Sequence, residues 1–426
     1  MGVMAIGTVE ALAEARERTL ALVASISDDD LLKVHSTLMS PLAWDLGHIA
    51  AFEDLWLVHR VGGEPLLHED LAATYDAFET PRAERGELEF LGPVQARDYL
   101  KRVRGRALEL LEANGWGDLH ELVLRHEQQH NETMLQTIQL ARITGYEPVC
   151  GDDRQASNGT RPATALELIE VPGGECTIGA PDGGFAYDNE RPSHRTDVRA
   201  YMISRTPVTN ATYLTFAEGG GYERREWWSE EGWAWKEEYD ITKPLAWTED
   251  LRAEWRLSKL EPLDPRRPVV HVSWFEADAF ARAHGAPLPT EIEWEKAATW
   301  DQQLGAARRF PWGNEELAPG VHANVDHVNR GPADAERHPA GASPYGCVGM
   351  IGDVWEWTSS SFRGYDGFSA YPYREYSEAF FGDDYKVLRG GSWATRARVA
   401  TPTFRNWDFP QRRQIFAGFR IARDLA

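Results

Sequence analysis

The sequence predicts an α+β protein in which an N-terminal four-helix bundle precedes an irregular domain of short strands and few helices. Residues up to about 148 carry apolar side chains at the three- and four-residue spacing of helices, and a polar, turn-rich stretch follows them. The later residues form short apolar runs broken by Gly, Pro, Asn and Trp. At 426 residues, the chain is also too long for one ordinary core. We therefore expect a helical domain over residues 1–150, a linker over 151–165 and a second domain over 166–426.

The helices of the first domain can be predicted in order. Four segments have the length and the apolar spacing of bundle helices, namely Val9–Ile26, Ser40–Val61, Pro93–Leu111 and Asp118–Ile143. The second of these is expected to begin with Ser40 as its N-cap and Pro41 in its first turn. In the second domain the clearest helices are expected at Trp274–His284 and Thr290–Trp300. Turns and buried aromatic side chains should provide the rest of its order.

Composition excludes several classes of partner. The chain has 45 Lys and Arg against 67 Asp and Glu, a net charge of −22, which argues against nucleic acid or an anionic membrane as partner. Its cysteines are widely spaced and odd in number, so they indicate neither a disulfide framework nor a thiolate metal cluster. The N-terminus has no basic segment followed by an apolar one, and no apolar run reaches the roughly 18 residues of a membrane helix. We expect a cytoplasmic protein.

Two histidines, His126 and His130, lie four residues apart in the last predicted bundle helix, on the stripe that faces the core. Such a pair can share one metal ion, which would satisfy both buried imidazoles at once. Two core histidines hydrogen-bonded to neighbours are the less favoured alternative. His48, on the apolar stripe of the second predicted helix with Trp44, is the expected third ligand. Three imidazoles suit Zn, Fe or Cu, so the ligand set alone does not name the metal.

The segment from His126 to His130 also has the H-E-x-x-H pattern of zinc peptidases, in which the intervening Glu is the general base. A peptidase of this kind takes its third ligand, a His or Glu, from downstream in the same domain. Residues 142–165 offer only Glu147, in a Gly- and Pro-containing stretch without a predicted helix. A zinc hydrolase is therefore a disfavoured alternative.

A series of motifs in the second domain resembles the formylglycine-generating-enzyme domain, a variant of the C-type-lectin fold. The motifs appear in this order: Val171–Glu175, Asp188–Pro192, Arg205–Asn210, Leu288–Glu295, Phe310–Gly313, Gly352–Trp357, Leu388–Trp393 and Gly418–Arg420. Preceded by a helical bundle of the DinB type with inward histidines, this domain is similar to that of the ergothioneine-type iron(II) sulfoxide synthases, in particular the actinobacterial ones. The resemblance covers essentially the whole chain.

The resemblance implies an O2-dependent enzyme that joins the thiol of γ-glutamylcysteine or cysteine to the imidazole C2 of hercynine (Nα-trimethylhistidine) and oxidises the sulfur to a sulfoxide. Fe(2+) would be held by His48, His126 and His130. Three neutral ligands leave the ferrous ion its full charge and leave positions for the substrates. Ovothiol-type synthases, which act on unmethylated histidine, are an alternative. They are disfavoured because they usually carry a further, C-terminal methyltransferase domain, whereas this sequence ends at Ala426.

Formylglycine generation is the alternative that the second domain suggests by itself. That chemistry depends on a pair of cysteines shortly after the Arg-Gly-Gly-Ser motif, which here occupies residues 389–392. The following residues, 393–399, read Trp-Ala-Thr-Arg-Ala-Arg-Val and contain no Cys. The corresponding copper site is therefore not expected.

The resemblance also assigns contacts with the thiol substrate. Arg82 and Arg85 would bind the carboxylates of γ-glutamylcysteine, although by themselves they would be interpreted as two solvated arginines. In the run Phe404–Arg412, Asp408 would meet the ammonium of the glutamyl group and Arg412 a carboxylate. Planar guanidinium groups serve such charge-assisted pairing well.

Contacts with hercynine and a catalytic group are assigned in the same way. Asn406 and Gln129 would position hercynine, and Trp407 or its neighbours would face its trimethylammonium group, a cation that aromatic faces attract. Without the resemblance Trp407 would be interpreted as a core residue. Tyr373 aligns with the tyrosine that supplies a proton or hydrogen atom to the reacting oxygen, and Tyr376 would line the same pocket. Because several tyrosines lie close together here, a purely structural hydroxyl at Tyr373 is the alternative.

Overall fold

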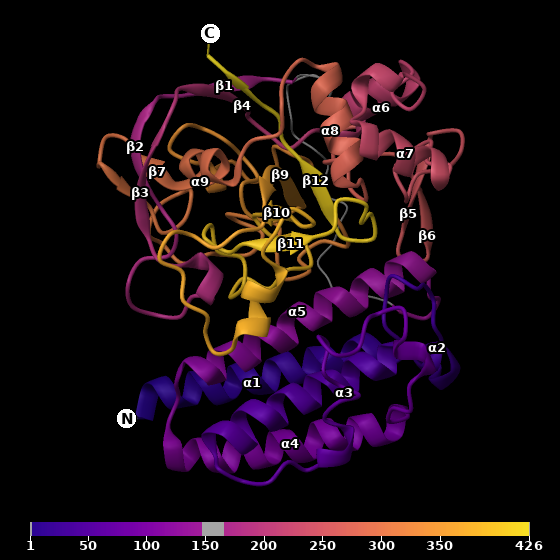
Figure 1. Cartoon of the computed structure of the whole chain (residues 1–426), viewed down its shortest axis with the longest axis vertical. Coiled ribbons are helices and arrows are strands. Elements are labelled where there is room, and N and C mark those ends of the chain that lie inside the picture. Colours follow the sequence, from indigo (N-terminus) through magenta and orange to yellow (C-terminus); the bar gives the residue numbers. More distant parts are fainter. Residues whose placement is uncertain (1, 147–165, 426) are drawn as a thin grey trace. The chain divides into compact units, whose positions relative to one another are not determined.

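The computed structural model describes residues 2–146 and 166–425 (Figure 1). They form two compact units, one made of residues 2–146 and 257–259 and the other of residues 166–256 and 260–425. The linker predicted over residues 151–165 lies outside the described residues. The chain combines a helical N-terminal part with a mixed one, as the predicted α+β class requires.

The first unit is a helical bundle. Its α-helices are α1 (Gly2–Val23), α2 (Asp28–Leu32), α3 (Leu42–Glu53), α4 (Pro93–Asn114) and α5 (Asp118–Ala141). Figure 1 shows the long helices α1, α3, α4 and α5 running alongside one another, with α3 packed on α4 and α5 and α1 packed on α5. The predicted four-helix bundle is confirmed, because its long helices coincide with the four predicted segments to within a few residues at most ends.

The second bundle helix differs from the prediction at both ends. It begins at Leu42, and the N-cap residue is Pro41, whose extended backbone (φ −57°, ψ 139°) precedes the helix. The predicted cap by Ser40 is wrong, since its Oγ instead accepts a hydrogen bond from Arg85 Nη1 (2.8 Å). At its other end the α-helix gives way to a π-helix, η1 (Asp54–Val61), and the short 3-10 turns η2 (Glu69–Leu71) and η3 (Arg85–Glu87) follow before α4.

The described residues from 166 onward form short strands and helices. The strands are β1 (Leu168–Val171), β2 (Gly174–Ile178), β3 (His194–Val198), β4 (Tyr201–Ser204), β5 (Ala253–Arg256), β6 (Lys259–Pro262), β7 (Trp300–Asp301), β8 (Ala306–Ala307), β9 (Trp355–Ser361), β10 (Lys386–Arg389), β11 (Asn406–Asp408), β12 (Ala417–Phe419) and β13 (Ala422–Asp424). The largest sheet has the order β11-β10-β9-β12, in which β12 is parallel to β9 and the other pairs are antiparallel. A three-stranded sheet has the order β1-β4-β13. Strand β11 therefore lies at a sheet edge.

The helices of this part are α6 (Asn210–Glu218), α7 (Glu230–Glu238), α8 (Trp274–Ala283) and α9 (Glu291–Thr299), with 3-10 turns η4 (Asp188–Glu190), η5 (Arg225–Trp227), η6 (Pro339–Gly341), η7 (Arg374–Tyr376) and η8 (Glu378–Phe380). Helices α8 and α9 confirm the two predicted ones. Helices α6 and α7 were not predicted, because their apolar residues do not recur on one face. Their starts are fixed locally, since the Thr209 and Ser229 side chains cap them.

The interior of the second unit contains ion pairs as well as aromatic rings. Trp294 and Trp357 are completely buried. Three arginines are equally buried, and each pairs with a glutamate: Arg389 with Glu295, Arg405 with Glu291 and Arg420 with Glu356. Buried charge is tolerated only where it is paired and hydrogen-bonded. These three ion pairs therefore hold in place the loops that are not held by strand pairing.

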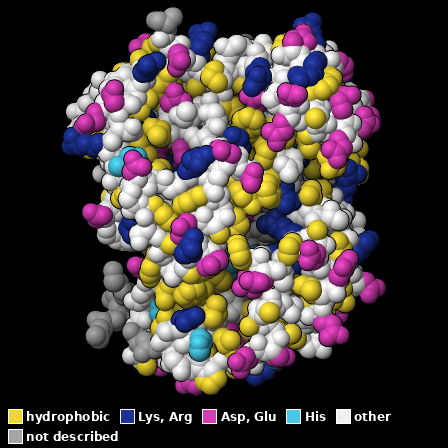
Figure 2. Space-filling model, in the orientation of Figure 1, with side chains coloured by type: hydrophobic (Ala, Val, Ile, Leu, Met, Phe, Trp, Pro, Cys, Tyr) yellow, Lys and Arg dark blue, Asp and Glu magenta, His cyan; other side chains and the backbone are white. Residues whose placement is uncertain are grey.

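The surface mixes both signs of charge. On the face drawn in Figure 2, Lys and Arg side chains are interspersed with Asp and Glu. Among the described residues, none of the helices combines the length and the apolar character needed to cross a lipid bilayer.

Candidate metal centre and substrate contacts

Three histidines of the helical unit converge on one point. His48 comes from α3 and His126 and His130 from α5, and one ring nitrogen from each lies within 4.8 Å of the other two. His48 Nε2 is 3.1 Å from His126 Nε2. Two nitrogens that bind one ion at about 2.1 Å, at roughly a right angle to each other, are about 3 Å apart. The three predicted ligands therefore have the spacing of a metal centre.

His48 and His126 are held in the form that binds metals. Burial lowers the pKa of His48 well below its ordinary value, and the neighbouring His130 lowers it further. Burial likewise lowers the pKa of His126, with His130 and His48 adding to the effect. Both imidazoles are consequently neutral at pH 7, as coordination requires.

Aromatic and backbone contacts orient two of the rings. His48 Nδ1 lies 2.7 Å from the carbonyl oxygen of Tyr75, and a donor at Nδ1 leaves Nε2 available as a ligand atom. The His48 ring stacks on Trp44, with centroids 4.9 Å apart and an angle of 11° between the planes. The His126 ring stacks in the same manner on Phe52, at 3.7 Å and 11°.

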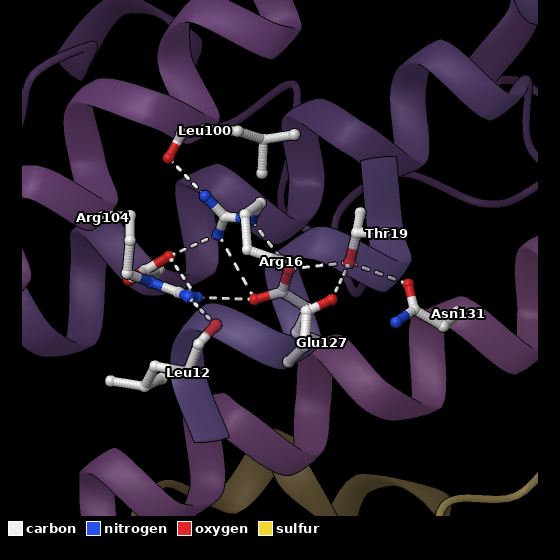
Figure 3. Close-up of polar contacts among 9 residues, drawn as sticks. Leu12, Arg16, Thr19, Leu100, Arg104, Glu127 and Asn131 are labelled. Carbon is white, nitrogen blue, oxygen red and sulfur yellow. Dashed lines mark hydrogen bonds and ion pairs between the residues drawn. The ribbon is translucent and has the colours of Figure 1, made fainter. Parts of the chain in front are cut away.

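Glu127, between the two histidines of α5, belongs to a buried network of ion pairs (Figure 3). Its Oε1 accepts hydrogen bonds from Arg16 Nε (2.8 Å) and Thr19 Oγ1 (2.7 Å), and its Oε2 accepts one from Arg104 Nη2 (2.6 Å). Both arginines also pair with Glu53 of α3. Burial opposes the charge of Glu127, but Arg16 and Arg104 outweigh it and lower the pKa to about 2. A carboxylate so engaged is unsuited to the general-base role that a zinc peptidase needs.

The two arginines predicted to bind carboxylates have different surroundings. Arg85 is buried, donates hydrogen bonds to Thr80 O (2.9 Å), Ser40 Oγ (2.8 Å) and Ala77 O (3.1 Å), and lies over the Trp44 ring. Arg82 is only half-buried, and among the described residues nothing forms a hydrogen bond or ion pair with it. Both cations lower the pKa of His48, so both lie near the histidines. Gln129 is half-buried on α5, immediately before His130.

The predicted thiol contacts of the second unit lie at a sheet edge. Asp408 ends β11, and its Cα pairs in register with Lys386 of β10. Arg412 follows in the loop, with its Nε 3.4 Å from Asp408 Oδ1. The Arg412 side chain is 13% exposed and the Asp408 side chain 18%. They form a loose pair of opposite charges that solvent reaches.

Trp407 and Asn406 form the rest of β11. The Trp407 ring stacks on Phe362, with centroids 4.2 Å apart and an interplanar angle of 8°, and it also contacts Phe380 at 5.6 Å. One face of this indole is therefore covered by the protein. Asn406 Oδ1 accepts a hydrogen bond from the Trp407 backbone N–H (2.9 Å).

Tyr373 directly precedes the 3-10 turn η7, and Tyr376 is the last residue of that turn. Their rings meet nearly edge to face at 6.1 Å, and Tyr376 stacks on Tyr187 with parallel planes at 5.4 Å. The adjoining Ser377 is buried, donates a hydrogen bond to Asp188 and accepts one from Asn189 Nδ2 (2.9 Å). Burial raises the pKa of Tyr376 well above its ordinary value, so its phenol stays protonated.

The sequence matches two known domain families. The profile of the sulfatase-modifying factor enzyme 1-like domain matches residues 154–425, and that of the DinB superfamily matches residues 11–134. The chain is 46% identical to the hercynine oxygenase of Mycobacterium tuberculosis, over 97% of this chain and 98% of that protein. The hercynine oxygenases of Mycolicibacterium smegmatis and Mycolicibacterium thermoresistibile are 44% and 45% identical, over 97% of this chain and 98% and 94% of those proteins.

The chain belongs to the hercynine oxygenase family. It is therefore an oxidoreductase, and the predicted family and fold class are confirmed. The formylglycine-generating enzyme of Streptomyces coelicolor is 32% identical over 62% of this chain and 91% of that protein. That likeness is to the second domain, where this member of the hercynine oxygenase family has no Cys over residues 393–399.

Sequence reasoning missed several residues around the candidate metal centre of this member of the hercynine oxygenase family. The carbonyl of Tyr75 and the pair Arg16 and Arg104 carry no motif, and they come from other segments of the chain. A further one, Asp45, lies three residues before His48, and its Oδ1 is 3.5 Å from His130 Nδ1. That spacing puts Asp45 and His48 on one side of α3, a signal that the sequence does contain.

Proposed function

We propose that this protein is an iron(II)-dependent hercynine sulfoxide synthase. It joins the thiol sulfur of γ-glutamylcysteine or cysteine to the imidazole C2 of hercynine. The C–H and S–H bonds break, the C–S bond and a sulfoxide form, and O2 supplies the sulfoxide oxygen while its second oxygen leaves as water. The observation that carries the proposal is the group of three convergent imidazoles, in a chain that matches hercynine oxygenases over 97% of its length.

His48, His126 and His130 are proposed to hold Fe(2+). Three convergent ring nitrogens, neutral at pH 7 for the two most desolvated rings, suit a divalent ion of this class. When bound, ferrous iron supplies the one-electron chemistry that O2 requires. The protein's part is to hold the rings, through the Tyr75 carbonyl and the Trp44 and Phe52 stacks, and to orient the organic substrates.

The thiol substrate is proposed to bind through charge. Arg82 is available for a carboxylate, because no hydrogen bond or ion pair to a described residue engages it. Asp408 and Arg412 together complement the ammonium and carboxylate groups of an α-amino acid. Their mutual contact of 3.4 Å is long for a hydrogen bond. These contacts favour γ-glutamylcysteine over cysteine as the thiol.

Hercynine is proposed to be positioned by the amides of Gln129 and Asn406. Its trimethylammonium group would meet the aromatic surface around Trp407, an attraction worth about 0.5–2 kcal/mol. Since Phe362 covers one face of the indole, the cation would use the opposite face or the neighbouring rings. Tyr373 is proposed to deliver a proton to the reacting oxygen, with Tyr376 shaping the same pocket. The stack of Tyr376 on Tyr187 and the Ser377 contacts support this segment.

The direct test is a product analysis with purified protein, ferrous iron, O2, hercynine and γ-glutamylcysteine. We expect a product whose mass equals both substrates plus one oxygen atom minus two hydrogen atoms. Histidine in place of hercynine serves as the comparison, because an ovothiol-type enzyme would prefer it. Formation of thiol oxidation products alone, with hercynine unchanged, would contradict the proposed function.

A further inference from the structure

Asp45 lies in the interior of the helical unit without a hydrogen bond. Its side chain is 1% exposed, and neither carboxyl oxygen has a hydrogen-bond partner among the described residues. A buried polar group in this state is costly, and native proteins seldom keep one without a reason. A hydrogen-bond donor to the Asp45 carboxylate is therefore to be expected.

His130 offers the complementary group. Its Nδ1 is also buried without a hydrogen bond, and it lies 3.5 Å from Asp45 Oδ1. One ring nitrogen and one carboxyl oxygen thus face each other just beyond the distance of a hydrogen bond. A shift of a few tenths of an ångström in the His130 ring would close the contact.

Metal-binding histidines generally donate their second ring N–H to a carboxylate or a carbonyl, which fixes the tautomer and the direction of the ligand atom. His48 already has such a partner in the Tyr75 carbonyl. We propose that Asp45 does the same for His130: it is a positioning residue that accepts the Nδ1–H of His130 when the metal binds, so that Nε2 is directed at the ion. This inference rests on the metal centre of the proposed function.

Asp54, another buried carboxylate of the helical unit, has the hydrogen bonds that are expected of a structural role. It is as buried as Asp45, but its Oδ2 accepts hydrogen bonds from Tyr99 (2.8 Å) and from the backbone N–H of Leu67 (2.8 Å). Arg85 lies close enough to Asp45 for their charges to interact, yet its hydrogen bonds go to Thr80, Ser40 and Ala77. The position of Asp45 therefore fits a role in orienting His130 and not a role in stabilising the fold.

The test compares Asp45→Asn with Asp54→Ala in full-length, metal-free protein, using Co(II) as the probe. For Asp45→Asn we expect Co(II) affinity to fall about 10- to 100-fold and the visible absorption bands of bound Co(II) to shift, with thermal unfolding of the metal-free protein unchanged. For Asp54→Ala we expect the opposite: a lower unfolding temperature, because the Tyr99 hydroxyl and the Leu67 N–H lose their acceptor, with Co(II) affinity and spectrum retained.

The His130→Ala variant distinguishes a failure of the proposed role of Asp45 from a failure of the proposed metal centre. In the His130→Ala background, adding Asp45→Asn should change Co(II) affinity by less than about twofold, because the group through which it acts is gone. If His130→Ala binds Co(II) as tightly as the unmodified protein, the proposed metal centre itself fails. If that centre holds but Asp45→Asn keeps the original affinity and spectrum, or lowers the unfolding temperature as Asp54→Ala does, the role of Asp45 is overturned.

Discussion

The guanidinium carbon of Arg85 lies 3.9 Å from the centroid of the Trp44 ring. Trp44 in turn stacks on His48, so the same indole contacts both the guanidinium group and the imidazole. Arg85 therefore contacts the side chain that supports His48, the first of the proposed metal ligands. Arg82, three residues earlier, has no such engagement with described residues. The two arginines, which the sequence presents as an equivalent pair, should respond differently to mutation.

Arg82→Ala should weaken the use of γ-glutamylcysteine more than that of cysteine. An Arg–carboxylate contact is worth about 1.5–3 kcal/mol, which corresponds to a loss of about 10- to 100-fold in kcat/KM. Steady-state kinetics with both thiols measures this. Arg85→Ala is the matched comparison: it should lower conformational stability and affect both thiols alike. An equal loss for both thiols with Arg82→Ala would remove the basis for assigning that residue to a carboxylate.

The three histidines can be tested by metal binding without turnover. At the Fe(II) concentration that saturates the unmodified protein, His48→Ala, His126→Ala and His130→Ala should each bind little Fe(II), and each should abolish sulfoxide formation. Metal content after anaerobic equilibrium dialysis is the measurement. His59→Ala is a suitable control, because His59 is exposed on the same unit. Full iron binding by the His48→Ala protein would show that the three-histidine site is wrong.

Helix periodicity is the part of this fold that the sequence specifies locally. The bundle helices and the pair His126 and His130 could be predicted, because a spacing of four residues fixes which side chains share a helix face. Helices α6 and α7 could not, since their capping hydrogen bonds, and not an apolar stripe, define them. The contact of Asp45 with His130 joins residues from two helices, so no local pattern encodes it.

The ion-pair network under α5 predicts a large effect from a single truncation. Arg104→Ala leaves Glu53 and Glu127 with Arg16 as their shared cation, and breaking a buried pair costs about 3–5 kcal/mol. Denaturant unfolding at pH 7 measures this loss. Arg106→Ala is the control, because Arg106 lies two residues further along α4 and its pairs with Glu64 and Glu109 are exposed. A loss below about 1 kcal/mol for Arg104→Ala, the size expected of a surface pair, would contradict the structural role of the network.

Asp353 makes the stability of the second unit depend on pH. Burial raises its pKa to about 7, although the Asn324 side chain and the Ala333 N–H donate hydrogen bonds to Oδ1. A carboxyl whose folded pKa is raised holds its proton more tightly when folded. The contribution of Asp353 to the unfolding free energy is therefore fully present below its pKa in the unfolded chain, and it is lost as the pH rises through about 7.

Asp353→Asn should accordingly flatten the fall in unfolding free energy between pH 4 and 7, and raise stability above pH 7 by up to about 3–4 kcal/mol. Asparagine can keep the accepting oxygen, and it tolerates the positive backbone φ of 61° at this position. Denaturant melts at several pH values check both statements. A variant that loses stability equally at pH 5 and pH 8 would show that the ionisation of Asp353 is not the cause.

Tyr373 can be tested by the product it favours, since binding and chemistry separate there. A thiol brought together with iron and O2 can be oxidised to a sulfinate without ever being joined to the imidazole, so a group must direct the outcome. A phenol within hydrogen-bond reach of the reacting oxygen is suited to this.

Tyr373→Phe removes only the hydroxyl, so apparent substrate affinities should stay within about twofold of the original. The ratio of coupled sulfoxide to thiol dioxygenation product, measured by mass spectrometry, should fall. Tyr371→Phe is the matched control for the register of this segment, because Tyr371 is 47% exposed. If Tyr373→Phe leaves the ratio unchanged, Tyr373 is a packing residue, and the proton comes from Tyr376 or from water.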